Sequence, residues 1–154
     1  MKPKKIVIDF ENSIGPWLGS TIKLLEYHLQ EKFNTHGLDL TKEQMIVLKR
    51  LHDQDGLSQN ELAFLILRNK SSLTRLLANM ENKDYVIRKQ CTEDKRINHV
   101  YLTSFGKEIF EKSKPAIKEM MEIMEHNISN EEKEQTIQTL KKIQHNFNSD
   151  LQSL

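Results

Sequence analysis

Apolar residues recur every three or four positions along most of this 154-residue chain, which is the spacing of amphipathic helices. The pattern predicts a first long helix from about residue 13 to residue 33, and Pro16 falls in its first turn, where a missing N–H does no harm. A second helix follows Thr41 and Gln44, a capping box whose side chains satisfy free N–H groups at a helix start.

Two shorter helices are predicted over about residues 58–81. Ser58 and Glu61 form a second capping box, and Asn69 is a suitable N-cap for the helix that follows. That helix turns its leucines inward and leaves a polar, cationic face outward. Two helices joined by a short turn, the second with such a face, are typical of a helix-turn-helix, whose second helix lies in the DNA major groove.

The outward residues of this second helix are the candidate DNA contacts. They are Lys70, Ser71, Ser72, Thr74, Arg75 and Asn79. Arg75 can present two N–H groups to guanine or to phosphate, and an ion pair with Glu81 is the alternative. The hydroxyl groups suit phosphate or base-edge hydrogen bonds, but they equally suit the start of a helix.

A segment rich in β-branched and aromatic residues follows at residues 85–91, and residues 98–102 offer it a partner strand. This hairpin, over about 85–102, is predicted to be the wing of a winged helix. Lys95 and Arg96 lie in its loop, from which they can reach phosphates or the minor groove. Asp94 is expected to orient Arg96 through an ion pair, and a plain solvated turn is the alternative.

Two long helices are predicted after the wing. Thr103 caps the first, which runs from Ser104 to about His126, and Pro115 within it predicts a kink or local unwinding. Ser129 and Glu132 form a third capping box. The terminal helix then carries Ile137, Leu140, Ile143, Phe147 and Leu151. One chain of this length cannot pack all these apolar stripes, so a second copy is expected to cover them; folding back onto the same chain is the alternative.

Positive charge is concentrated in the helix-turn-helix and the wing. The whole chain has 23 Lys and Arg residues against 22 Asp and Glu residues, a net charge of +1. Residues 68–107 hold nine of the basic residues and four of the acidic ones, a net charge of +5. Because the phosphate backbone dominates DNA affinity, this excess favours DNA binding over the alternative of a winged-helix protein adaptor, which does not need it.

Four fragments, in order, carry a family resemblance. They are Glu61-Leu62-Ala63, SSLTR at residues 71–75, Asp94-Lys95-Arg96, and Leu102-Thr103 with Gly106. Together they resemble the multiple-antibiotic-resistance regulator (MarR) family, over nearly the whole chain. The resemblance implies a mainly α fold in which residues 1–154 are a single MarR-type domain. Within it a winged helix-turn-helix core, at about 36–103, lies between dimerisation helices at about 10–35 and 104–154.

The same resemblance implies a homodimer that binds a double-stranded DNA operator of pseudo-palindromic sequence and represses transcription. The expected location is the cytoplasm of a bacterial or archaeal cell, in association with the nucleoid. The chain departs from the family pattern at Asp84, where Gly is usual. We expect a left-handed backbone there, which Asp tolerates better than most residues.

A small aromatic or phenolic effector is also implied by the resemblance, in a pocket between the dimerisation helices and the winged core. Residues that suit its walls are Trp17, Tyr27, His28, Met45 and Leu48. The alternative is that these are ordinary core residues where the two parts meet. His28, on the apolar face of the first helix, fits either a hydrogen-bonded core position or a pocket wall.

The sequence gives little support to other chemistry. It contains no Gly-rich loop, no G-x-S-x-G motif and no closely spaced carboxylate pair, so an enzyme is not expected. The six histidines show no metal-ligand spacing, and neither a metal nor another cofactor is expected. No apolar run is long enough to span a membrane, so a membrane partner is not expected.

Cys91 is the single cysteine of the chain, which excludes an internal disulfide and fits a reducing compartment. A redox-responsive regulator that uses Cys91 is an alternative function, since some members of the family sense peroxides with one cysteine. In those relatives the cysteine lies in the first helix, whereas Cys91 lies on the first strand of the wing. A structural thiol is therefore the favoured interpretation.

Overall fold

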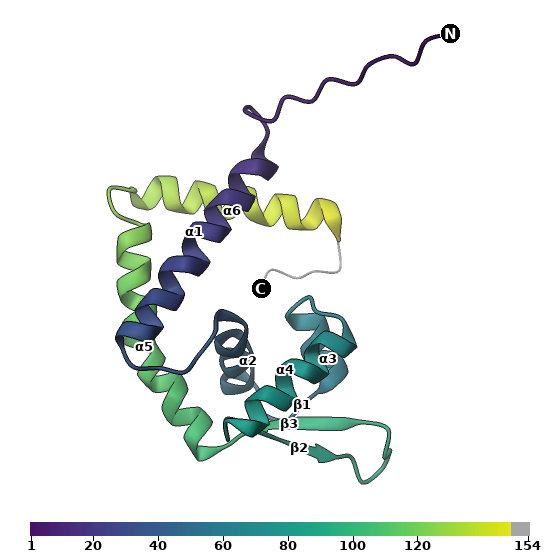
Figure 1. The fold of residues 1–154 in the computed structure, drawn as a ribbon, viewed down its shortest axis with the longest axis vertical. Coiled ribbons are helices and arrows are strands. Elements are labelled where there is room, and N and C mark those ends of the chain that lie inside the picture. The colour runs from purple at the N-terminus through teal and green to yellow at the C-terminus, as the bar shows by residue number, and fades with distance from the viewer. Residues whose placement is uncertain (149–154) are drawn as a thin grey trace.

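The computed structural model describes residues 1–148, which form six helices and a small antiparallel sheet (Figure 1). The elements are α1 (Ile14–Thr35), α2 (Lys42–Asp53), β1 (Leu57–Ser58), α3 (Gln59–Leu65), α4 (Lys70–Asn82), β2 (Val86–Gln90), β3 (Asn98–Leu102), α5 (Ser104–Met124) and α6 (Asn130–Phe147). This order confirms the predicted fold class: α3 and α4 are the helix-turn-helix, and β2 and β3 are the wing. Among these residues, no helix has both the length and the apolar character to cross a membrane.

The wing is an antiparallel hairpin in which Val86 lies opposite Leu102 and Gln90 lies opposite Asn98. Its second strand also pairs with β1, so that the strand order is β1-β3-β2. The sequence did not predict β1, because two residues are too short to show an alternating pattern. Gly56, with a φ of +76°, donates its N–H to the Val100 carbonyl at 3.0 Å and leads the chain into this strand.

The predicted helix starts are confirmed. The three capping boxes pair Thr41 with Gln44, Ser58 with Glu61, and Ser129 with Glu132. At the start of α4, Asn69 accepts the backbone N–H of Ser72 at 2.8 Å. Asp84 has the expected left-handed backbone, with a φ of +65°. Short-range hydrogen bonding thus explains where these helices begin and how the chain leaves α4.

Several predicted boundaries are corrected by the structure. α1 continues to Thr35, past the predicted end at residue 33, because the first left-handed residue after it is Gly37. β2 is shorter than the predicted 85–91. Tyr85 donates its N–H to the last turn of α4 at Met80, and Cys91 bonds to Ile97 within the loop of the wing.

The last two helices also differ in detail from their prediction. α5 ends at Met124 instead of about His126, and it remains helical through Pro115, so of the kink or local unwinding expected there the unwinding is absent. Ser113 and Ala116, on either side of this proline, are fully buried, so packing holds the helix together there. The predicted contribution of Leu151 to the terminal helix lies outside the described residues.

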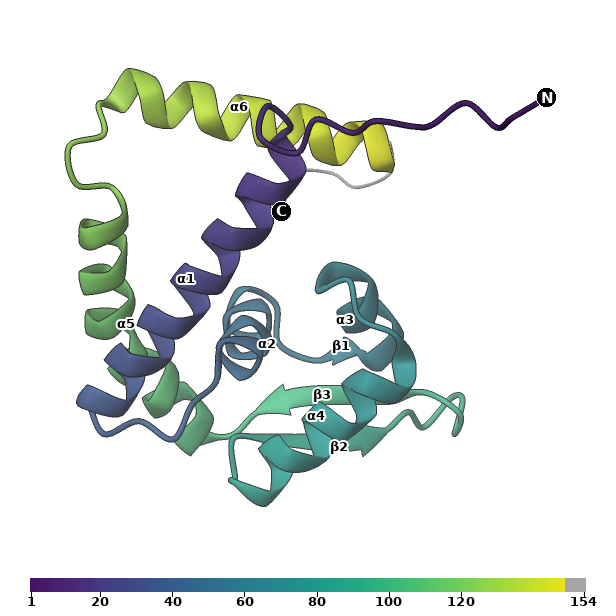
Figure 2. The ribbon, with the colours of Figure 1, turned by 45° about the horizontal axis from the view of Figure 1, so that its top comes forward.

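Buried side chains form one cluster, centred on the helix-turn-helix and the sheet. Its most deeply buried members include Phe33, Leu48, Leu51, Leu62, Leu73, Leu77, Met80, Val86 and Val100. The remaining part of the chain, residues 1–28 and 121–148, contains no buried residue, and we call it the outer lobe. Its largest helical portions, the start of α1 and all of α6, lie on the side of the molecule away from the sheet in both views, and it also includes the end of α5 (Figures 1 and 2).

Candidate nucleic-acid interface

The recognition-helix candidate α4 has one buried side and one exposed side. Leu73, Leu77 and Met80 pack into the core, as the helical spacing predicts. On the other side, the candidate contacts Lys70, Ser71, Thr74, Arg75 and Asn79 are exposed, and Ser72 is half-buried. The amphipathic pattern of the sequence therefore places these six side chains on the outer side of the helix.

Arg75 does not form the alternative ion pair with Glu81. The Glu81 carboxylate instead accepts a hydrogen bond from Arg88 Nε at 2.6 Å, which ties α4 to β2. Lys70, the first residue of the same helix, is also a cation. Within residues 1–148, the side chains of Arg75 and Lys70 make no ion pair. Both charges are therefore available to an external anion.

The hydroxyl groups near the start of α4 have local partners. Ser71 Oγ donates to Asn69 Oδ1 at 2.9 Å, and Ser72 Oγ accepts from Arg68 Nε at 2.8 Å. Thr74 Oγ1 donates to the Lys70 carbonyl at 2.8 Å. A helix start produces these bonds on its own, but each oxygen still has a lone pair or a proton to offer from an exposed or half-exposed site.

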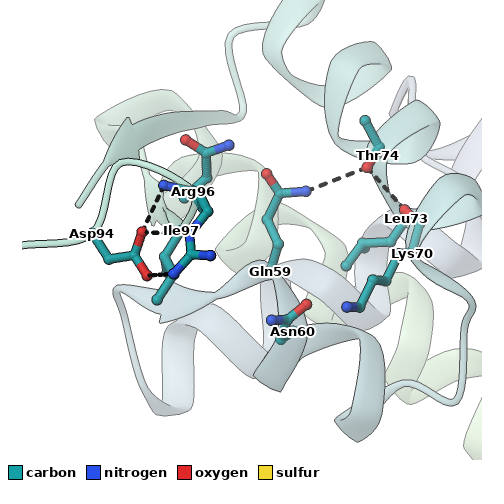
Figure 3. Close-up of a pocket in the computed structure, with 9 residues that line it drawn as sticks. Gln59, Asn60, Lys70, Leu73, Thr74, Asp94, Arg96 and Ile97 are labelled. Carbon is teal, nitrogen blue, oxygen red and sulfur yellow. Dashed lines mark hydrogen bonds and ion pairs between the residues drawn. The ribbon is translucent and has the colours of Figure 1, made fainter.

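A groove of about 520 Å³ separates α4 from the wing (Figure 3). It is lined by Gln59, Asn60, Lys70, Leu73, Thr74, Asp94, Arg96, Ile97 and Asn98. Gln59 Nε2 donates to Thr74 Oγ1 at 3.4 Å across its base, joining α3 to α4. The groove therefore brings residues of the recognition helix and of the wing, far apart in sequence, to one polar surface.

The loop of the wing is held by Asp94. Its carboxylate accepts hydrogen bonds from Arg96 Nε and from a terminal guanidinium nitrogen, both at 3.1 Å, and from the Arg96 backbone N–H at 3.0 Å. These bonds hold the pKa of the Asp94 carboxyl below its usual range, and the side-chain bonds from Arg96 have a larger effect than the backbone one. The Arg96 side chain remains 90% exposed because the pair uses one edge of the guanidinium. Lys95, beside it, is exposed as well.

Two features of this surface were not predicted. Gln59 and Asn60 line the groove, but they follow the capping residue Ser58 and carry no signal beyond that of a helix start. On the other flank of α4 lies a second recess of about 260 Å³, which Arg68, Ser72, Arg75 and Asn79 help to line. Arg75 thus lies at a different hollow from the one that faces Arg96.

The five residues predicted to line an effector pocket are not brought together. Leu48 is fully buried in the core, and Met45 packs half-buried beside that core. Trp17 and Tyr27 are 66% and 67% exposed. Helical spacing placed Trp17, Tyr27 and His28 on α1, but only the C-terminal part of that helix enters the core.

His28 is not a core residue, because its side chain is 51% exposed, with Nδ1 3.7 Å from the Glu31 carboxylate. It does line a small apolar recess of about 130 Å³ between α1 and α5. The other lining residues are Thr21, Leu24, Leu25, Lys32, Met120, Ile123 and Met124. This recess differs from the predicted pocket because α5, and not α2, supplies its second wall.

Cys91 is half-buried at the end of the first wing strand, as expected for a semi-exposed thiol. The pKa of the Cys91 thiol is lowered mainly by hydrogen bonds from the backbone N–H groups of Asp94 and Glu93, and His99 lowers it further. His99 itself is held by a 2.8 Å hydrogen bond between Nδ1 and the Gly56 carbonyl. These contacts favour the thiolate without assigning it a function.

Comparisons with known proteins agree with this geometry. Residues 40–97 match the family model described as the MarR family. The chain is 32% identical over 110 residues to the uncharacterized HTH-type transcriptional regulator YdgJ of Bacillus subtilis, covering 71% of this chain and 67% of that protein. It is 33% identical over 105 residues to the transcriptional regulator HosA of Escherichia coli O157:H7, covering 68% and 78% respectively.

Solved structures show the same fold. The S. aureus MepR–DNA complex superposes with a TM-score of 0.82 at 26% identity, covering 90% of this chain and all of that one (100%). A MarR protein from Peptoclostridium difficile gives a TM-score of 0.83 at 24% identity, with 96% and 95% of the two chains covered. The likeness therefore includes the outer lobe as well as the winged part.

Proposed function

The chain belongs to the MarR family of transcriptional regulators, and we propose that it represses transcription as a homodimer on a pseudo-palindromic DNA operator. The observation that carries this proposal is the groove between α4 and the wing, with Lys70 on one wall and Arg96 on the other. An α-helix with an exposed polar face fits the major groove, and a cationic wing then contacts the flanking backbone. The MepR structure, a relative in fold, was solved with DNA.

The outer lobe supports the dimer. Exposed apolar side chains lie on each of its helices, among them Trp17 on α1, Met121 on α5 and Ile137 on α6. Surfaces of this kind on one chain mark contacts with another. A dimer with two recognition helices about 34–36 Å apart matches two half-sites on one face of the duplex. Together with the DNA partner, we propose a location at the nucleoid, in the cytoplasm of a bacterial or archaeal cell.

Selection from random duplexes tests the proposal. The wild-type protein is expected to enrich a sequence with two inverted half-sites and to show a steep fall of affinity with salt. Arg75→Ala is expected to weaken that binding and relax the preference at one base pair by about 1–3 kcal/mol. Lys112→Ala, on α5, is a control that removes an exposed cation outside the interface.

Two outcomes would contradict these expectations. A shallow salt dependence with no enriched sequence would favour the protein-adaptor alternative. Unchanged affinity and preference in Arg75→Ala would show that this residue does not read the operator.

The proposal extends to a small aromatic or phenolic effector. Its support is the apolar recess between α1 and α5, where His28 and Lys32, which lie beside the Glu31 and Glu119 carboxylates, border apolar walls. At about 130 Å³ the recess is below the usual 300–1,000 Å³ of ligand pockets, so it must widen or be completed by a second copy. A thermal-shift screen of aromatic acids tests it. Compounds that stabilise wild-type and His28→Ala protein equally would place the pocket elsewhere.

A further inference from the structure

The turn that follows α4 is tied to the linker between α1 and α2. Lys83 Nζ lies 2.8 Å from Asp39 Oδ1 and 3.2 Å from Gln44 Oε1. Two residues later, the Tyr85 hydroxyl donates to the Asp39 carbonyl at 2.6 Å. Asp39 lies in the linker, between the end of α1 at Thr35 and the start of α2. The C-terminal end of the recognition helix is thus bound to the segment that arrives from the outer lobe.

That linker is in turn fixed to α1. Gln30 Nε2 donates to the Leu40 carbonyl at 3.0 Å, and the Leu38 N–H donates to the Phe33 carbonyl at 2.9 Å. Leu38 and Leu40 are both buried. Because the linker is anchored on each side of Asp39, a rotation of α1 would also move Asp39 and, through it, Lys83.

The same turn also touches α5, the other helix that leads to the outer lobe. Thr103, the N-cap of α5, donates its N–H to the Tyr85 carbonyl at 3.2 Å and its hydroxyl to the Asp84 carbonyl. A Cβ at Gly106 would lie 2.0 Å from the Tyr85 carbonyl oxygen, so the first turn of α5 packs directly on it. Both helices that enter the outer lobe are therefore connected to residues 83–85, α1 through Asp39 of the linker and α5 through its own first turn.

We propose that Lys83 and Tyr85 are positioning residues that fix the angle of α4 against α1 and α5, and so set the half-site spacing that a dimer accepts. This inference rests on the proposed dimeric function. The link is stiff because three elements converge on it and Tyr85 is 3% exposed. Burial, with the Asp39 charge second, raises the pKa of Tyr85, so its hydroxyl keeps the proton that it donates. Without the link, α4 samples a wider range of angles.

Operators with altered spacing test the inference. The duplex that the wild-type protein selects is remade with one or two base pairs added or removed between its half-sites. Affinity for each duplex is then measured for wild-type, Lys83→Met, Tyr85→Phe and Arg88→Met protein. Arg88→Met is the matched control, because Arg88 is a similarly covered cation whose pairing with Glu81 joins α4 to β2 and does not involve the linker between α1 and α2. It loses the same charge near DNA but leaves the link to Asp39 intact.

The expected result concerns one ratio for each protein, the affinity for the selected operator divided by the affinity for an operator of altered spacing. The absolute affinities do not decide the test. Wild-type and Arg88→Met proteins lose affinity steeply when the spacing changes, and in Lys83→Met and Tyr85→Phe that loss is smaller by about threefold to tenfold. A merely structural role would lower all affinities together and leave the ratio unchanged. Equal steepness in all four proteins overturns the inference. Failure of the proposed function looks different, since the wild-type protein then selects no sequence with two half-sites, and the positioning role falls with it.

Folding is checked first, by thermal unfolding of each variant. Tyr85→Phe removes a single oxygen atom and carries the test if Lys83→Met does not fold. The distance between spin labels at Ser71→Cys in the two copies, in a Cys91→Ser background, gives a second readout that needs no operator. The distribution of that distance is expected to broaden in Tyr85→Phe but not in Arg88→Met, and equal widths would overturn the inference.

Discussion

The winged core, residues 36–103, and the outer lobe are built from the same kind of amphipathic helix, but they bury it to different extents. α4 has 13 residues and buries Leu73, Leu77 and Met80. α6 has 18 residues, begins with an equally well-formed side-chain cap, and buries none. The two helices differ less in their own pattern than in what the chain places beside them.

This contrast shows which part of the molecule buries its apolar side chains without a second chain. The winged core covers its apolar side chains with its own sheet and helices and with the adjoining turns of α1 and α5, all from the same chain, so its stability is a property of the single chain. The outer lobe leaves an apolar face open, and such a face is covered by another surface or stays exposed to water. In the proposed dimer, the stability of the outer lobe then depends on protein concentration.

The largest effect is expected from a cavity in the winged core. Leu77 is fully buried, so Leu77→Ala should lower the free energy of unfolding by about 2–5 kcal/mol. Urea unfolding measures the change. Ile137→Ala, at an exposed site on α6, is the comparison and should cost less than about 0.5 kcal/mol in the dissociated chain. Equal costs for the two variants would contradict the division into two regions.

A charge on the open face of α6 should break the dimer and spare the core. Ile137→Asp is expected to weaken self-association by about 2 kcal/mol or more, while the urea midpoint of the dissociated chain is unchanged. Gln135→Asp places the same charge on the far side of the helix, two positions away, and should leave association intact. Sedimentation equilibrium distinguishes them. If the two variants associate equally well, α6 does not supply the interface.

In the wing, the expected effect is on DNA affinity and not on folding. Arg96→Ala should weaken binding to all sequences alike and reduce the slope of affinity against salt by about one unit per subunit. Asp94→Ala keeps the Arg96 charge but removes the hydrogen bonds that orient it, so it should lower affinity while the slope is kept. Fluorescence anisotropy over a salt series measures both. An effect of Arg96→Ala confined to particular sequences would mean that it reads bases or groove width.

Replacing two matched helix-capping serines, one in each region, should give the smallest changes in stability and the closest comparison of the two regions. Ser58 and Ser129 both head reciprocal capping boxes, so replacement by Ala should cost about 1 kcal/mol at either site. The cost should appear in core unfolding at any protein concentration for Ser58→Ala. For Ser129→Ala it should appear as weaker self-association. Identical concentration dependence for the two variants would argue against a separate outer lobe.

Much of the fold could be predicted because its signals are local. The capping boxes, Asn69 and the inward leucines of α4 each act within one or two helical turns, and the structure has them as predicted. The β-branched and aromatic content of the wing strands is a local signal as well. Even Asp84, which departs from the family pattern, adopts the expected backbone for a reason contained in that residue.

The features that could not be predicted depend on contacts between distant residues. β1 exists through its pairing with β3, and Lys83 meets Asp39 across 44 positions of sequence. His28 lies on the apolar stripe of α1, but which part of that stripe enters the core is decided by the packing of α5. The proposed pocket walls failed to converge for the same reason.

The mass of the protein, free and on its selected operator, tests the central claim most directly. Sedimentation of the wild-type protein is expected to give twice the 18.1 kDa mass of the chain, with two chains on each operator. Ile137→Asp should give the single-chain mass and bind the same duplex more weakly, with the core still folded. A wild-type protein that stays at the single-chain mass and occupies its operator as one copy would contradict the account.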